Sequence, residues 1–278
     1  HLLSRRQRQM CIRDRVSFML KQDRLMEITN IMQSKKRIRT EDLAKITFSS
    51  ISTIRRDVIF LEKQGLVKRL HGEIILNNFN TVEPSQFLRE SENVIKKRTI
   101  ASLAKDFIAP GMCIYLDSST TVYELCPFLC DIEHLIIFTN GLNTALKLAE
   151  YGNPTMKIFI TGGEVKHFSS SVVNLDIENS LLNHFNIDIA FCSARGIDEF
   201  NVYEVSLSQA VSKKRIIDKA KETILLIDSS KFEVTGFFKI NDLKKYRAII
   251  SDKLPNKNIL NATELLDVEW ISGDEEYI

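Results

Sequence analysis

A run of small polar residues, Ser118-Ser119-Thr120-Thr121, follows an apolar segment and precedes a stretch of helical character. Backbone N–H groups at the start of a helix, with hydroxyls beside them, can bind a phosphate or another anion. Lys213 and Lys231 are candidates to add positive charge to such a site. Ser and Thr clusters are more often helix caps, however, and an isolated lysine is usually solvated, so both interpretations stay open.

A second polar group lies nearer the N-terminus, on a different expected helix. Ser52, Thr53, Arg55 and Arg56 fall near its first turns and away from its apolar face. Arginine can pair with guanine through two hydrogen bonds, and serine or threonine can bind a base or a phosphate. The pattern therefore indicates a helix that reads the DNA major groove. The alternative is that these arginines lie on the solvated face of a protein-interaction module.

The sequence around this second group predicts three short helices. Apolar residues at three-to-four spacing predict a first helix over residues 22–34. Thr40 is expected to cap a short second helix, and Ser50 or Ser52 to cap a third helix that ends before Gly65. The expected buried side of the third helix consists of Ile51, Ile54, Val58 and Leu61.

A hairpin is expected directly after the third helix. Two short β-prone runs over residues 66–76 are broken at His71-Gly72, which predicts a two-stranded wing. Three helices and a hairpin describe a winged helix-turn-helix, whose wing would place Lys68 and Arg69 along the phosphate backbone. The residues expected to contact DNA are Thr40, Ser50, Ser52, Thr53, Arg55, Arg56, Lys68, Arg69 and His71.

Charge is distributed unevenly along the 278 residues. Residues 1–18 carry a net charge of +4, residues 19–77 carry +5 and the remainder carries −7, which together give the overall +2. A small basic unit joined to a larger acidic one suggests that the first unit meets a polyanion. A basic face that is merely solvated is the simpler alternative.

The composition argues against several classes of protein. Hydrophobic residues make up 44% of the chain, so it can bury a sizeable core and is not mainly disordered. No apolar run approaches the roughly 20 residues that span a bilayer, so we expect no membrane protein. The five cysteines form no CxxC pair, which favours a reduced, cytoplasmic protein without a zinc or other metal site.

The chain is expected to contain two domains. Residues 1–18 lack helical or strand periodicity and are interpreted as a non-native or disordered extension, residues 19–77 as the winged helix-turn-helix, and residues 78–95 as a linker. In residues 96–278, apolar strands alternate with amphipathic helices, which predicts a parallel sheet covered on both faces. The expected fold class is an α+β winged helix-turn-helix domain joined to an α/β Rossmann-like three-layer domain.

Ligands of such sheets bind beyond the carboxyl ends of the strands. The expected strands cover residues 112–116, 135–139, 156–161, 187–193, 222–228 and 246–251. The expected helices cover about residues 96–108, 120–129, 142–151, 175–185 and 208–220. Polar residues follow the first three strands, at 117–121, 139–141 and 161–166, so a ligand site is expected at this edge of the sheet.

The segment TIRRDVIFLEKQGLVKRLHGEIIL, residues 53–76, closely resembles the DNA-binding signature of the DeoR family of bacterial repressors. The usual sequence in that family is close to TIRRDL, followed by EQGL and then by a basic segment with HGG. Glu73 stands here in place of the second glycine, which indicates a changed wing turn or phosphate contact. The resemblance implies that this domain binds DNA.

The second domain resembles the effector domain of the same family through DSSTTVYEL, TNGL, TGGEVKHFSSSVV and IDSSKF. The resemblance implies a domain similar to ribose-5-phosphate isomerases and CoA transferases that senses phosphorylated sugars. Three departures from the family pattern leave the identity of the ligand open: Ser119 for glycine, Arg195 for a small or acidic residue, and Gln209 for glutamate. The expected effector-binding residues are Asp117, Ser118, Ser119, Thr120, Thr121, Thr139, Asn140, Gly162, Gly163, Lys166, Glu204, Lys213 and Lys231.

Residues and resemblance together predict a transcriptional repressor of carbohydrate metabolism genes that a phosphorylated sugar releases from DNA. The expected partners are a double-stranded operator, the sugar phosphate and further copies of the chain, with no cofactor. One alternative is an isomerase-like enzyme with Asp117, Asp198 or Glu204 as general base, and another is a structural DNA-binding protein without a ligand. The sequence shows no clear acid and base pair, so catalysis is not expected.

Overall fold

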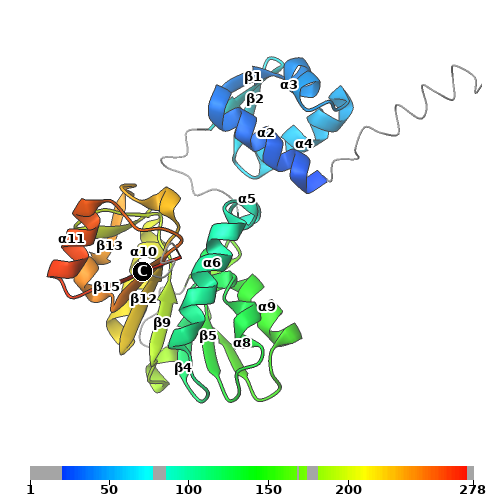
Figure 1. Cartoon of the computed structure of the whole chain (residues 1–278). Helices are drawn as coiled ribbons and strands as arrows, with labels where there is room; N and C mark the ends of the chain where they lie inside the picture. The colour runs from blue at the N-terminus through cyan, green and yellow to red at the C-terminus, as the bar shows by residue number, and fades with distance from the viewer. Residues whose placement is uncertain (1–20, 78–85, 168, 174–180, 274–278) are drawn as a thin grey trace, which may run out of the picture. The chain divides into compact units, whose positions relative to one another are not determined.

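The computed structural model describes residues 21–77, 86–167, 169–173 and 181–273 (Figure 1). The chain divides into two compact units, His1–Asn77 and Asn78–Ile278. The expected extension over residues 1–18 and the first part of the expected linker, residues 78–85, lie outside the described residues.

The described part of the first unit is the predicted winged helix-turn-helix. Its elements are α2 (Lys21–Lys35), β1 (Arg37–Arg39), α3 (Thr40–Ile46), α4 (Ile51–Lys63), β2 (Val67–Leu70) and β3 (Glu73–Leu76). The three strands form an antiparallel sheet in the order β1-β3-β2. Apolar side chains of α2 and α4, among them Leu25, Ile28, Ile54 and Leu61, are almost completely buried and form the core of this unit.

The predicted turn of the wing joins β2 to β3 at His71-Gly72. Both residues have a positive φ, 49° for His71 and 81° for Gly72. Two consecutive positive φ values are typical of the tight turns whose twist matches that of a hairpin. Glycine adopts this conformation without steric cost, whereas His71 does so at the expense of some backbone strain.

Two expectations about the helices of the first unit are wrong. Thr40 is the first residue of α3 and does not cap it, because its hydroxyl donates a hydrogen bond of 3.1 Å to the carbonyl oxygen of Gly72 in the wing turn. Ile51 is 42% exposed as the first residue of α4, so the buried side of that helix begins at Ile54.

The second unit is built around a parallel sheet of seven strands, in the order β15-β14-β12-β9-β4-β5-β6. These strands are β4 (Cys113–Leu116), β5 (Ile136–Thr139), β6 (Lys157–Ile160), β9 (Ile189–Cys192), β12 (Glu222–Leu226), β14 (Ala248–Ser251) and β15 (Glu269–Ser272). Successive side chains of β4 enter different cores: Ile114 and Leu116 enter one, and Cys113 and Tyr115 the other. The sheet is therefore covered on both faces, as predicted.

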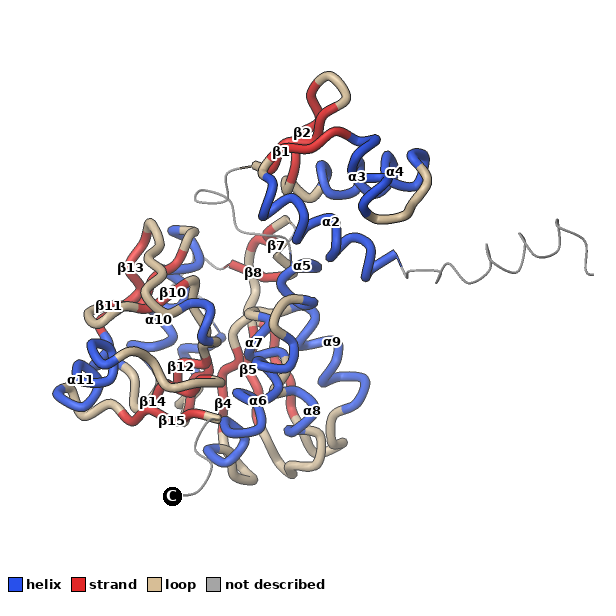
Figure 2. Tube along the Cα trace, turned by 45° about the horizontal axis from the view of Figure 1, so that its top comes forward, coloured by secondary structure: helices blue, strands red, loops and turns tan. Residues whose placement is uncertain are grey.

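Helices form the two outer layers (Figure 2). Apolar residues of α6 (Val94–Ala104), α7 (Thr120–Tyr123), α8 (Cys126–Leu129) and α9 (Leu142–Tyr151) join the core that contains Ile114. Residues of α10 (Leu207–Lys219) and α11 (Lys257–Leu265) pack on the opposite core. This arrangement confirms the α/β three-layer fold class.

Several expected segments differ in detail. Residues 86–91, expected in the linker, form the helix α5 (Gln86–Ser91). The helix expected over residues 120–129 is two short helices, and the second one begins beside Pro127, which suits the first turn of a helix because it has no N–H to donate. Of the helix expected over residues 175–185, the described part is the 3-10 helix η2 (Leu181–His184).

The fold also contains elements that the sequence did not predict. They are the hairpin of β7 (Glu164–Lys166) and β8 (Ser171–Val173), the small sheet of β10 (Gly196–Ile197), β11 (Asn201–Glu204) and β13 (Phe238–Asp242), the helix α11 and the edge strand β15. Three short 3-10 helices each follow another element. They are η1 (Lys105–Phe107) after α6, η3 (Ser229–Lys231) after β12 and η4 (Leu243–Lys245) after β13.

The described residues offer neither a membrane-spanning helix nor a metal site. No helix in this part of the chain is long and apolar enough to cross a membrane. No group of His, Cys, Asp and Glu side chains within it is arranged to hold a metal ion. Its cysteines are free thiols, and burial raises the pKa of Cys126 to about 12.

Candidate functional site

The start of α4 presents the polar residues expected to contact DNA. Ser50 caps the helix by accepting a hydrogen bond of 3.1 Å from the backbone N–H of Thr53, and its hydroxyl also lies 2.9 Å from that of Ser52. Ser52, Arg55 and Arg56 are exposed, and the Nε of Arg56 donates to the carbonyl oxygen of Ser52 at 3.3 Å. The capped, exposed first turns of α4 therefore offer two guanidinium groups and several hydroxyls to a partner.

The wing carries ion pairs that tie it to the rest of its unit. Arg69 on β2 binds Glu62 of α4, with Nη2 and Oε2 2.6 Å apart, and this hydrogen-bonded pair lowers the pKa of Glu62. Glu73 on β3 accepts a hydrogen bond of 2.7 Å from the Nε of Arg37 on β1. Glu73, the departure from the family signature, thus fixes β3 to β1. Lys68 on β2 is exposed and is the wing cation most available to a phosphate.

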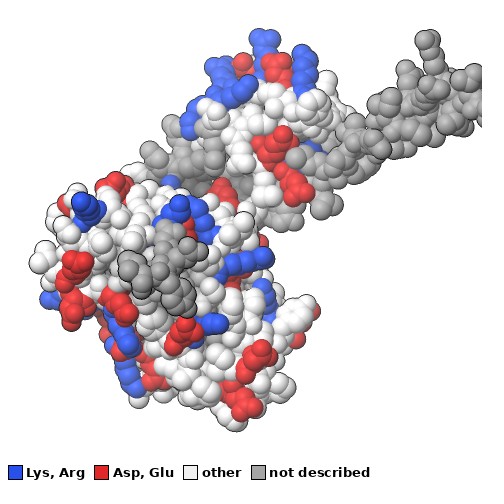
Figure 3. All heavy atoms as spheres, viewed as in Figure 1, with Lys and Arg blue, Asp and Glu red and all other residues white. Residues whose placement is uncertain are grey.

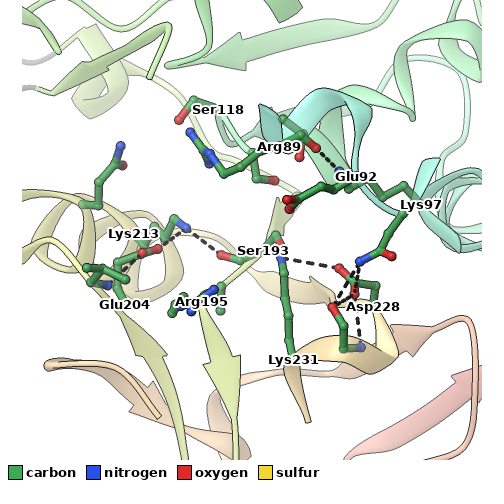
Figure 4. Close-up of a pocket in the computed structure, with 17 residues that line it drawn as sticks. Arg89, Glu92, Lys97, Ser118, Ser193, Arg195, Glu204, Lys213, Asp228 and Lys231 are labelled. Carbon is green, nitrogen blue, oxygen red and sulfur yellow. Dashed lines mark hydrogen bonds and ion pairs between the residues drawn. The ribbon is translucent and has the colours of Figure 1, made fainter. Parts of the chain in front are cut away.

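The second unit does not present a single-sign surface on the face that is visible in Figure 3, where acidic and basic side chains are interspersed. Its concentrated charge lies instead inside a pocket of about 120 Å³ at the carboxyl ends of the central strands β4, β9 and β12 (Figure 4). The lining residues are Arg89, Glu92, Asn93, Lys97, Ser118, Ser119, Thr120, Ser193, Ala194, Arg195, Glu204, Val205, Gln209, Lys213, Asp228, Ser230 and Lys231.

Six of the thirteen expected effector residues line this pocket. They are Ser118, Ser119, Thr120, Glu204, Lys213 and Lys231. The residues after β5 and β6 do not reach it, because β5 and β6 lie at one edge of the sheet. Thr139 and Asn140 are buried there, and Asn140 donates through Nδ2 to the carbonyl oxygen of Val172 in β8 at 3.2 Å. Gly162, Gly163 and Lys166 belong to the strand end and hairpin at the same edge.

Asp117 and Thr121 are buried behind the pocket wall. The carboxylate of Asp117 accepts the backbone N–H of Ser119 and that of Ser193, each at 2.8 Å. It therefore holds the chain after β4 against the chain after β9. Asp117 positions the pocket rather than lining it.

Lys213 and Glu204 form an internal ion pair on one side of the pocket (Figure 4). The Nζ of Lys213 donates to Oε2 of Glu204 at 2.6 Å and to the carbonyl oxygen of Ser193 at 2.7 Å, and it lies 3.5 Å from Oδ2 of Asp117. Burial favours neutral Lys213, but the two carboxylates outweigh burial and raise its pKa. Burial likewise opposes ionisation of Glu204, and Lys213 lowers the pKa of that carboxyl. The charge of Lys213 is thus already balanced inside the protein.

Lys97 and Lys231 also line the pocket and are less well balanced, and the Nζ of Lys231 lies 3.3 Å from the hydroxyl oxygen of Ser193. Burial, followed by the positive charge of Lys231, lowers the pKa of Lys97 to about 8. Burial also lowers the pKa of Lys231, and the positive charges of Lys213 and Arg89 act in the same direction. The nearest carboxylate, Asp228, has its Oδ2 3.7 Å from the Nζ of Lys231. An anion in the pocket would therefore stabilise both ammonium groups.

Sequence reasoning missed several lining residues, among them Arg89, Asn93, Lys97 and Asp228. One signal for Lys97 was present in the sequence. Lys97 shares a face of α6 with Ile100, Ala101 and Ala104, all of which are buried, and a lysine on an apolar helix face is a sign of a special environment. Arg89 carries no such signal, because it lies in the Asn-rich and charged residues 78–95, whose composition predicts a linker.

The lining side chains include five cations and three carboxylates. The cations are Arg89, Lys97, Arg195, Lys213 and Lys231, and the acids are Glu92, Glu204 and Asp228. With Lys213 and Glu204 paired to each other, the remaining surplus of positive charge suits a small anionic ligand. The hydroxyls of Ser118, Ser119 and Thr120 also line the pocket and can add hydrogen bonds to a ligand. The Ser119 hydroxyl caps α7 by accepting the backbone N–H of Val122 at 3.2 Å, so it remains available as a donor.

A winged helix-turn-helix in one unit and a cationic pocket at the strand ends of a Rossmann-like second unit define a ligand-sensing, DNA-binding regulator. The family described as "DeoR-like helix-turn-helix domain" matches residues 24–79, and the family described as "DeoR C terminal sensor domain" matches residues 92–253. The chain belongs to the DeoR family of transcriptional regulators.

Named relatives agree with this assignment. The chain is 32% identical over 234 residues to the putative aga operon transcriptional repressor of Escherichia coli O157:H7, covering 83% of this chain and 86% of that protein. It is 31% identical over 235 residues to the lactose phosphotransferase system repressor of Streptococcus mutans, covering 84% and 93%. The fold of the second unit resembles that of ribose 5-phosphate isomerase from Plasmodium falciparum, with 20% identity, coverage of 50% and 52% of the two chains, and a TM-score of 0.36.

Proposed function

We propose that this chain is a cytoplasmic repressor of carbohydrate metabolism genes, and that a phosphorylated sugar bound in the pocket of the second unit releases it from its operator. The observation that carries the proposal is the presence of two incompletely balanced lysines in the pocket lining, the buried Lys97 and the half-buried Lys231. Of the two relatives described above, one is named as a putative repressor of the aga operon and the other as the repressor of a lactose phosphotransferase system, and the second name supports carbohydrate genes as targets.

The effector's phosphate is assigned to the space between Lys97, Lys231 and the hydroxyls of residues 118–120. A phosphate monoester carries close to two negative charges at neutral pH and three acceptor oxygens. Two ammonium groups and neighbouring hydroxyls match that charge and that number of acceptors. Lys213 takes no part in this contact, because two of its three N–H donors already bind Glu204 and Ser193 and the Asp117 carboxylate lies 3.5 Å from its Nζ.

Operator DNA is assigned to the exposed start of α4 and to the wing. Arg55 and Arg56 would reach base edges or phosphates in the major groove, with Ser52 and Thr53 beside them. Lys68 and His71 on the wing would follow the phosphate backbone. Arg69 keeps its pair with Glu62, and Thr40 keeps its bond to Gly72, so both support the fold of the interface.

The helix α5 is the first described element of the second unit, and it contributes to the pocket. Arg89 and Glu92 line the pocket at the end of α5, and the Nδ2 of Asn93 donates to Oδ1 of Asp228 at 3.2 Å. A ligand that draws Arg89 or disturbs the Asn93 bond would shift α5, and with it the chain that leads to the DNA-binding unit. We propose that the active repressor is a homo-oligomer, in which two linked readers bind paired operator half-sites.

A thermal-shift series tests the effector assignment. Inorganic phosphate, pentose 5-phosphates, hexose 6-phosphates and their unphosphorylated parents are each added to the purified chain. A ligand that binds only the folded state raises the apparent melting temperature. A rise that requires the phosphate group is expected for at least one sugar phosphate. No rise with any phosphorylated compound would contradict the assignment.

A further inference from the structure

Gln209 is the polar pocket residue whose bonding is only half complete. Its side chain lies on α10, lines the pocket and is 4% exposed. Its Nε2 donates a hydrogen bond of 3.0 Å to the hydroxyl of Ser171 on β8, whereas its Oε1 has no hydrogen-bond partner. A buried carbonyl oxygen without a donor is costly, so such an atom calls for an explanation.

The direction of the hydrogen bonds beyond Gln209 fixes which atom of its amide binds Ser171 and which atom is left without a partner. The carbonyl oxygen of Lys166 can only accept, and the hydroxyl of Ser169 donates to it at 3.3 Å. The hydroxyls of Ser169 and Ser171 are 2.6 Å apart, so Ser171 donates to Ser169. Ser171 must then accept from Gln209, which requires Nε2 on that side and leaves Oε1 as the amide atom without a partner.

From this geometry we infer that Gln209 selects effectors that carry a hydroxyl group, which donates a hydrogen bond to Oε1 when the phosphate is bound by Lys97 and Lys231. The inference rests on the proposed function and adds a residue that determines ligand specificity. A carbonyl or carboxylate oxygen at the same place would meet Oε1 as a second acceptor and be rejected. A phosphate ester without any hydroxyl would leave Oε1 buried and unpaired.

The neighbouring carboxylate does not duplicate this role. Oε2 of Glu204 accepts from Lys213 at 2.6 Å, and Oε1 accepts the backbone N–H of Val205 at 3.0 Å. Both oxygens of Glu204 are therefore engaged, whereas Oε1 of Gln209 is buried without a partner. The carboxylate of Glu92, which also lines the pocket, is exposed to solvent. The serine hydroxyls of the pocket can act as donors or acceptors, so they discriminate less sharply.

Isothermal titration calorimetry with two kinds of phosphate ester tests the inference. Monomethyl phosphate carries the phosphate without a hydroxyl, and the second probe is the tightest binder among pentose 5-phosphates and hexose 6-phosphates. For the Gln209→Leu variant, we expect the affinity for the sugar phosphate to fall roughly tenfold while that for monomethyl phosphate changes less than twofold. Retained binding of monomethyl phosphate also shows that the variant pocket is folded.

A second variant, Ser171→Ala, keeps Oε1 but removes the group that orients the amide. Its preference for the sugar phosphate over monomethyl phosphate should fall by a smaller factor than in Gln209→Leu. Suppose that both esters bind the wild-type protein and that Gln209→Leu lowers the two affinities by the same factor or leaves both unchanged. Gln209 then does not discriminate between the esters, and only the assignment of the phosphate to Lys97 and Lys231 stands. If neither ester nor inorganic phosphate binds the wild-type protein, the proposed function itself is overturned.

Discussion

The ammonium group of Lys97 on α6 donates a hydrogen bond to the backbone carbonyl oxygen of Arg89 on α5. This bond joins α5, the first described helix after the DNA-binding unit, to α6. Both residues line the pocket. Lys97 also faces Asp228, Glu92 and Lys231, so its charge state responds to whatever occupies the pocket. A ligand anion near Lys97 would therefore act on the contact between α5 and α6 directly.

The pKa of Lys97 makes effector binding pH-dependent. A phosphate favours charged Lys97, whose pKa in the free protein is lowered to about 8. The free protein loses this proton as the pH rises through that value, so the affinity for a sugar phosphate should fall about tenfold between roughly pH 7 and pH 9. Calorimetry in buffers of different ionisation enthalpy should show proton uptake on binding near pH 8.

The Lys97→Met variant should bind the effector more weakly at neutral pH and lose most of this pH dependence. The matched control is Lys105→Met, since Lys105 lies just after α6, is exposed and does not line the pocket. An unchanged pH profile in Lys97→Met would show that another group titrates.

Replacing Lys231 should separate effector binding from DNA binding. Lys231→Met removes a charge-assisted contact to the phosphate, worth roughly 2 kcal/mol, so the effector affinity should fall by about 30-fold. Operator affinity without effector should stay within about twofold of wild type, because Lys231 lies in the second unit. Fluorescence anisotropy with labelled operator, with and without sugar phosphate, measures both quantities. A normal effector response in this variant would remove Lys231 from the site.

Arg55→Ala should weaken operator binding. Loss of a base or phosphate contact by an arginine costs about 1–3 kcal/mol, and binding should also become less sensitive to salt if the contact is to phosphate. Lys63→Ala is the matched control, since Lys63 is an exposed cation in the last turn of the same helix α4. Equal losses in the two variants would point to a general charge effect and not to contact by the start of α4.

Asp57, within the family signature, is expected to act on stability rather than on DNA. Its carboxylate is 2% exposed and accepts from the Nε of Arg24 on α2 at 2.5 Å, which ties α2 to α4. Asp57→Ala leaves Arg24 without this partner and should destabilise the first unit by roughly 3 kcal/mol. Asp42→Ala, at an exposed pair with Lys45, should cost less than about 1 kcal/mol. Urea denaturation of both variants measures the difference.

Much of this fold follows from local patterns in the sequence. Burial of one helix face gives the three-to-four spacing of Leu25, Ile28 and Met32. Burial of both faces of a sheet gives the uninterrupted apolar runs of strands such as β4 and β12. The strands β1 and β10 have three and two residues, which is too short for any periodicity to show. They are defined by their pairing with the longer strands β3 and β11, which lies outside any local pattern.

The pocket was only partly predictable for a different reason. Residues that follow strands could be identified one by one, but the order of strands in the sheet decides which of them meet. The strand β9 lies between β4 and β12, so Ser193 and Arg195 enter the pocket, whereas the residues after β6 remain at the edge. Similarly, the sequence predicts that Arg69 contacts the DNA phosphates from the wing, and only the fold shows that its guanidinium pairs with Glu62.

The most direct test of the central claim is operator affinity measured as a function of sugar phosphate concentration. An operator selected from random DNA by the wild-type chain is titrated with protein at increasing concentrations of the effector found by thermal shift. The account predicts that operator affinity falls with the phosphorylated sugar and does not change with its unphosphorylated parent. Operator affinity that is unaffected by a sugar phosphate known to bind the chain would contradict the claim that the pocket controls DNA binding.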